Sequence, residues 1–136
     1  MAEPSANAEL GDPAYGSDPG TITYEADESI TAGDAVTIDS SNQLLQAANS
    51  NDTNSAIVGV AADDAEDGDN VAVHVEGRIV CNVASGVTAG EELAASTTDG
   101  QLGTGTGGIV ALTDAGGVAG LSAGYSLGSN AAVVEL

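Results

Sequence analysis

The stretches SITAGDAVTID at residues 29–39 and GVTAGEELAAS at residues 86–96 share one pattern, in which Thr-Ala-Gly and an acid precede alternating apolar residues. Val87 stands 57 positions after Ile30, and the same offset relates DSSNQLL at 39–45 to STTDGQL at 96–102. A glycine followed by an acid is typical of a tight turn with positive φ that leads into a strand. The repeat therefore predicts two half-domains of one plan, near 29–47 and 86–104, with Gly33 and Gly90 as structural turns.

The acids of the repeat, Asp34 and Glu91, could instead mark a duplicated site for a cation or a cofactor. A side-chain oxygen just after a glycine turn accepts backbone N–H groups nearby, which explains both acids without a ligand. This interpretation predicts that Gly33→Val and Gly90→Val damage folding, whereas Asp34→Asn is nearly silent at high salt.

From residue 21 onward, short β-branched runs with period two alternate with Gly, Asp, Asn and Ser, as in strands joined by turns. We expect an all-β fold, a small compact barrel or sandwich with two similar halves and short helical turns at 62–68 and within 116–130. The predicted strands are 21–25, 35–39, 44–47, 57–61, 70–76, 78–83, 92–95, 109–112 and 131–136.

Residues 1–20 contain all 3 prolines of the chain among Gly, Ser, Asn and acids. Such a segment buries too little apolar surface to order itself, so we expect an N-terminal arm that is disordered or docked on a neighbouring subunit. Residues 21–136 then form a single β domain. Tyr15 and Tyr24 are candidate interface anchors, although Tyr15 could equally be exposed on a floppy tail.

Charge is the dominant feature of the composition, with 21 acids against one cation, Arg78, and a formal net charge of −20. Such a chain repels itself in dilute salt, whereas in ~1 M salt the Debye length falls to ~3 Å and the repulsion is largely screened. The composition therefore indicates adaptation to high salt, with loosely held solvent cations around the acids. It argues against binding to nucleic acid, which requires a basic patch.

Few residues could perform chemistry, so the sequence predicts neither an enzyme nor a cofactor. His74, the only histidine, alternates with valines and is expected to face solvent or an interface rather than to act as a base. The only cysteine, Cys81, is expected to be a buried small hydrophobe. GLSAG at 120–124 has the letters of a nucleophile elbow but no preceding apolar strand.

Metal binding and a membrane location are not expected either. The acidic stretch at 63–70 resembles a calcium loop, but Ala65 occupies a ligand position and His74 stands where the bidentate glutamate belongs. No lysine is present to carry biotin or lipoate. The N-terminus has no signal-peptide pattern, and no run of 18 apolar residues occurs, so we expect no Sec export and no membrane partner.

Residues from about 28 to 112 resemble the capsid cement, or head-decoration, proteins of tailed viruses. The resemblance lies in the order of ITAGDAVTIDSSNQLLQA, AIVGVAADDAEDGDNVAVHVEGRIV and VTAGEELAASTTDGQL. It implies a compact, non-catalytic β domain, usually a homotrimer, that sits on the outer face of an icosahedral shell and bridges major capsid protein subunits. The acidity and missing lysines depart from the family, and they suit a virus of a salt-loving host.

The resemblance also implies a location on the outer capsid surface of the virion, after synthesis in the host cytoplasm. Arg78 is then a candidate interface residue, either paired with Glu76 or with an acid of a neighbouring chain, or simply exposed at a strand end. A surface or adhesion module of a halophilic cell, binding glycans or other proteins, is the alternative function, and it predicts an export signal or a linker that the sequence does not show.

Overall fold

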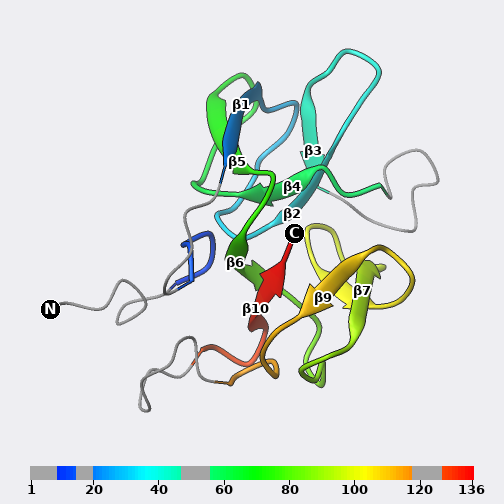
Figure 1. Cartoon of the computed structure of the whole chain (residues 1–136). Helices are drawn as coiled ribbons and strands as arrows, with labels where there is room; N and C mark the ends of the chain where they lie inside the picture. Colours follow the sequence, from blue (N-terminus) through cyan, green and yellow to red (C-terminus); the bar gives the residue numbers. More distant parts are fainter. Residues whose placement is uncertain (1–8, 15–19, 47–55, 118–126) are drawn as a thin grey trace, which may run out of the picture.

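The computed structural model describes residues 9–14, 20–46, 56–117 and 127–136. The regular structure of these ranges is entirely β, which confirms the predicted all-β class (Figure 1). The first half of the chain contains β1 (Thr21–Glu25), β2 (Ala35–Ile38), β3 (Leu44–Gln46), β4 (Gly59–Ala61) and β5 (Asn70–His74). The second half contains β6 (Arg78–Asn82), β7 (Glu92–Ala95), β8 (Leu102–Thr104), β9 (Ile109–Ala111) and β10 (Ala131–Glu135).

The two halves have the same topology. Each is a five-stranded antiparallel sheet, in the order β1-β5-β4-β2-β3 for the first half and β6-β10-β9-β7-β8 for the second. Adding five to each strand number therefore converts one sheet into the other, which confirms the prediction of two similar halves. Figure 1 shows the first half above the second, joined where β5 leads into β6.

Strand register repeats as well. Ala35 pairs with Val60 in the first half, as Glu92 pairs with Val110 in the second. The offset of 57 relates β1 to β6 and β2 to β7, but it becomes 58 between β3 and β8. The predicted constant offset is thus wrong by one residue from this point, because the loop between β7 and β8 is one residue longer than the loop between β2 and β3.

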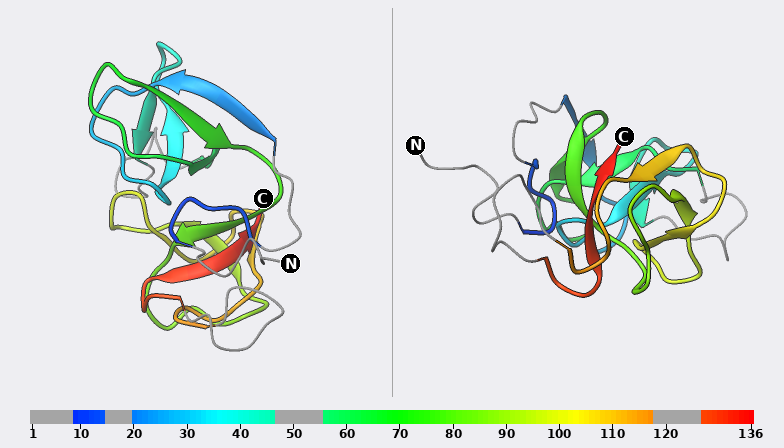
Figure 2. Two further views of the ribbon diagram at one scale, coloured as in Figure 1. Left: turned by 90° about the vertical axis from the view of Figure 1, so that its left-hand side faces the viewer. Right: turned by 60° about the horizontal axis from the view of Figure 1, so that its bottom comes forward.

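Each sheet curls until its outer strands meet, so that each half is a small barrel (Figure 2). In the first half, a parallel bridge between Ala26 and Leu44 joins the end of β1 to β3. In the second, the bridge between Val83 and Leu102 does the same for β6 and β8. Closure protects most strand edges from unwanted pairing.

Small aliphatic residues fill both barrels. The first-half core is one cluster of buried side chains. The second-half core also includes Ala35 and Val60 from the first half, both fully buried. The two barrels therefore share part of a core, and neither buries its apolar residues alone.

Two sequence expectations differ from the structure, and a third lies mostly outside the described residues. The described residues contain no helix, because Ala65, at the centre of the predicted helical turn 62–68, exchanges backbone hydrogen bonds of 2.8 and 2.9 Å with Ile30. Most of 116–130, where a second helix was expected, lies outside the described residues. Strand β8 was not predicted, because Leu102 is its only large apolar residue among glycines and threonines.

Part of the predicted arm lies on the chain's own body. Gly11 and Ala14 donate backbone hydrogen bonds of 2.8 Å to β6, at Val80 and Arg78, and Val80 donates one of 2.9 Å to Asp12. The segment 9–14 therefore covers the outer edge of β6. No helix in the described part of the chain is long and apolar enough to cross a membrane.

Candidate functional site

The repeated Thr-Ala-Gly-acid segments form two matching turns. Gly33 and Gly90 have φ of 89° and 92°, a conformation that favours glycine. In the first turn, Thr31 N–H donates to the Asp34 carboxylate at 2.8 Å. In the second, Thr88 N–H donates to Glu91 at 2.6 Å. Both acids therefore cap their own turns, in the manner expected from the sequence.

The surroundings of the two acids differ. Asp34 is buried where the halves meet, and its carboxylate also accepts the Gln46 side-chain amide at 2.7 Å. Burial raises the pKa of Asp34, against the opposing effect of hydrogen bonds from Thr31, Gln46 and Asn82. Glu91 lies at the surface, and the hydrogen bond from Thr88 N–H lowers its pKa. Only the first turn is thus part of a buried contact.

His74 and Cys81 are both buried. Of the two positions expected for His74, facing solvent or an interface, the solvent-facing one is wrong, because segment 9–14 covers it and its Nε2 lies 2.9 Å from the Gly11 carbonyl oxygen. Its Nδ1 has no partner among the described residues. Burial raises the pKa of the Cys81 thiol, which leaves it protonated and unreactive. The arrangement fixes the arm rather than activating a nucleophile.

Two of the three predicted interface residues, Arg78 and Tyr24, lie in the described ranges. Arg78 forms an ion pair with Glu135, its cross-strand neighbour on β10, with Nε and Oε1 3.3 Å apart. Pairing with Glu76, pairing with a neighbouring chain and an exposed strand-end position were the alternatives from the sequence, and Glu135 is a further partner within the chain. Tyr24 is half-buried against the first-half core. Tyr15 lies outside the described residues.

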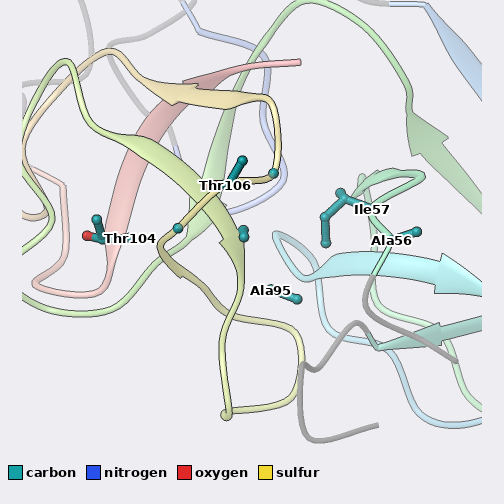
Figure 3. A pocket seen from close by; sticks show the side chains of 8 residues that line it. Ala56, Ile57, Ala95, Thr104 and Thr106 are labelled. Carbon is teal, nitrogen blue, oxygen red and sulfur yellow. The ribbon is translucent and has the colours of Figure 1, made fainter. Parts of the chain in front are cut away.

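Two hollows in the described surface are lined mainly by small and apolar residues. One, of about 470 Å³, lies between the segment at Ala56 and Ile57 and the β7–β8 region around Thr104 and Thr106 (Figure 3). Its lining contains no ionisable side chain. A second, of about 490 Å³, lies between Leu10 of the arm and the end of β10. Its lining includes one ionisable side chain, Glu9.

A third hollow, of about 280 Å³, is lined by three acids around the first turn. Two of these acids cap backbone groups, since Asp64 accepts Ala32 N–H at 2.8 Å and Asp69 accepts Glu66 N–H at 3.0 Å. No cluster of three or more metal-ligating side chains occurs in the described ranges. The acids of this loop therefore have structural partners within the chain.

Two exposed apolar side chains were not singled out by the sequence patterns. Ile22 on β1 is 49% exposed, and Val110 on β9 is 39% exposed. Both lie in ordinary strand patterns, so only a comparison of the two halves, strand by strand, could have shown that they are unusual. Their counterparts in the other half, Ile79 and Val60, are completely buried.

The described residues thus form two closed β units with capped turns and a partly shared core. Comparison with known families identifies the class of protein. The model of the phage cement protein family matches residues 14–132, and the chain belongs to this family. No curated protein matches the chain.

Membership establishes the general role of the chain. It is a structural protein that stabilises a capsid, its partner is a capsid protein, and its place is in the virion. The family is typically non-enzymatic.

Proposed function

We propose that this chain decorates the outer surface of the icosahedral capsid of a tailed virus, as a homotrimer that bridges neighbouring capsid subunits in a salt-rich host. The family match over 14–132 carries the proposal. The charge of −20 supports the salt-rich setting, because only screening allows so many acids to gather on a repetitive surface.

Weak contacts suffice for such a protein. A trimer on a shell engages several sites at once, so each subunit can contribute little while the whole binds firmly. The small aliphatic core also favours this role, since binding to a partner adds stability that the isolated chain lacks.

The proposal is tested with capsids that lack the cement protein, mixed with the purified chain in molar salt. We expect co-sedimentation with the shells and a higher temperature of shell disruption. An unrelated protein of similar size and charge serves as the control for non-specific adsorption. If the shells bind the control equally well, or if bound protein leaves their disruption temperature unchanged, the proposed role is wrong.

A further inference from the structure

The two halves of the chain meet through different surfaces. The first half contributes its turn: Gly33 C=O accepts Asn82 N–H at 2.9 Å, and Ala35 N–H donates to Gly100 C=O at 2.8 Å. The second half contributes the outer edge of β6 and the β7–β8 turn. We call the first set the head surface and the second the tail surface.

Apolar packing joins the same surfaces. Val60, beside the first turn, and Ile79, on β6, belong to one buried cluster, and both are fully buried. The contact therefore combines backbone hydrogen bonds with a shared core, which are the two ingredients of a specific protein interface.

Strand register assigns a counterpart to every residue of this contact. The positive φ of Asn42 (62°) and Gly100 (76°) confirms that these two occupy the same place in their turns. The head residues Gly33, Asp34, Ala35 and Val60 correspond to Gly90, Glu91, Glu92 and Val110, and the tail residues Ile79, Asn82 and Gly100 correspond to Ile22, Glu25 and Asn42.

Both counterpart surfaces are open. On the second head, Gly90 is exposed and Val110 is 39% exposed, against 0% for Val60. On the first tail, Glu25 and Asn42 are exposed and Ile22 is 49% exposed, against 0% for Ile79. Figure 1 places the loop before β7 at the bottom of the molecule and β1 at the top, so the two surfaces do not meet within one chain.

A head-to-tail contact between two like units leaves one head and one tail free, and such surfaces complement each other on separate copies. We propose that the head surface of one copy (Gly90, Glu91, Glu92, Val110) binds the tail surface of a second copy (Ile22, Glu25, Asn42). The contact buries Val110 against Ile22 of the next copy, as Val60 and Ile79 are buried within each chain.

This contact is weaker than the joint inside the chain, for two reasons. Segment 9–14 adds to the internal joint through Gly11 and Leu10, which pack against Ala61 and Gly33, and it has no counterpart in the second half. The proposed contact between copies also has an acid where the joint inside the chain has a neutral residue, because Glu25 corresponds to Asn82. Association therefore requires salt, whose ions screen the carboxylates.

A heterologous contact of this kind closes into a ring or extends into a filament. It deepens the self-association in the proposed function, and it is tested with the protein alone. Failure of this test leaves the shell-binding experiment fully informative, because that experiment measures a different partner.

The test uses Val110→Gln and Ile22→Gln, which remove the apolar anchors without changing the charge. Both side chains are exposed in the single chain, so the variants should fold, and circular dichroism checks this. Sedimentation velocity in molar salt should show association of the wild-type chain, and dissociation constants raised about tenfold or more in each variant. Leu112→Gln is the matched control, because Leu112 is 38% exposed and its counterpart Ala62 lies outside the shared cluster.

Mixing the two variants tests the head-to-tail geometry. Each variant keeps one intact surface, so an equimolar mixture should form pairs and nothing larger. A wild-type chain that stays monomeric in molar salt, or two folded variants that associate like wild type, would overturn the proposal. Self-association by Val110→Gln alone, with none by Ile22→Gln, would instead indicate a symmetric pairing of two β1 strands and would also overturn it.

Salt dependence gives an independent readout. Glu25→Gln restores the amide found at Asn82, so its association should persist to lower salt than that of the wild type. An unchanged salt dependence would contradict the placement of Glu25 beside Glu91 of the next copy.

Discussion

Asp34 and Glu91 occupy the same position in two copies of one turn, and their surroundings move their pKa values in opposite directions. Burial raises the pKa of Asp34, whereas the Thr88 N–H group lowers the pKa of Glu91. The pKa of Asp34 should therefore lie above that of an ordinary Asp, and the pKa of Glu91 below that of an ordinary Glu. Carboxyl NMR titration of the folded chain in molar salt measures both values, and an Asp34 pKa that is not raised would contradict the effect expected from its burial.

These shifts have opposite effects on stability. The Asp34 contribution is full below about pH 4 and is lost as the pH rises through its raised folded pKa. The Glu91 contribution is present above about pH 4 and is lost as the pH falls through its lowered folded pKa. In the Asp34→Asn variant, the free energy of unfolding should therefore fall less than in the wild type as the pH rises. In the Glu91→Gln variant, it should fall less than in the wild type as the pH is lowered.

Asp34→Asn should also destabilise the fold at neutral pH. Thr31 N–H and the Gln46 amide both donate to Oδ2, so an amide oxygen at that place keeps both hydrogen bonds. The NH₂ group then takes the place of the other carboxylate oxygen and loses the hydrogen bond with the Asn82 side chain, which leaves a buried polar group unpaired. We expect a loss of about 1–3 kcal/mol in the free energy of unfolding. This differs from the nearly silent effect expected from the sequence alone, because burial of Asp34 is a tertiary property. Denaturant unfolding in molar salt, with Glu91→Gln as the milder control, distinguishes the two expectations.

Gly33 and Gly90 should differ in tolerance of a side chain. Alanine at either position costs about 1–2 kcal/mol, because the turn holds φ near +90°. A Cβ on Gly33 would also lie 2.5 Å from the Leu10 Cβ, whereas one on Gly90 would meet no atom within 4 Å. Unfolding curves should show Gly33→Ala as the more damaging exchange, and equal losses would indicate that segment 9–14 does not pack on the turn.

At the scale of elements, segment 9–14 acts as an extra strand on β6. It forms three backbone hydrogen bonds with β6 and buries the side chain of Ala14. The carbonyl oxygen of Gly11 also lies within hydrogen-bonding distance of His74 Nε2. Each such hydrogen bond contributes about 0.5–1.5 kcal/mol net. The segment therefore fastens the first half to the second.

Deletion of residues 1–14 should lower the free energy of unfolding by about 2–4 kcal/mol, from the lost hydrogen bonds. It also exposes the β6 edge, which should promote aggregation. Deletion of 1–8 alone is the control, because it leaves these contacts in place. Denaturant unfolding and light scattering measure both effects, and equal behaviour of the two deletions would show that the segment contributes no stability.

At the scale of the whole molecule, charge and a small core set the conditions for folding. With a net charge of −20 and no Phe or Trp, the compact state needs screening to overcome self-repulsion. The melting temperature should rise steeply between dilute and molar salt. Thermal melts across this range check the prediction, and a melting temperature indifferent to salt would contradict adaptation to brine.

Much of the architecture follows from local sequence. Short runs of alternating apolar residues bounded by turn residues predict nine of the ten strands in the described ranges, and the glycines of the two repeated turns predict where the chain reverses. Strand β8 was not predicted, because its three residues include only one large apolar side chain and therefore show no period-two pattern. The expected helical turn at 62–68 was wrong because the backbone of Ala65 pairs with Ile30, a residue 35 positions away.

The sequence by itself determined the all-β class, the duplication and the turn glycines, because these depend on residue type and on neighbours along the chain. Only the tertiary structure decided that Asp34 is buried whereas Glu91 lies at the surface, and that Ile79 is buried whereas Ile22 is exposed. It also decided that Arg78 pairs with Glu135. The physical reason is that two nearly identical halves are joined head to tail. Equivalent residues in such a joint have the same local structure and different surroundings, and no local pattern records which of the two is covered.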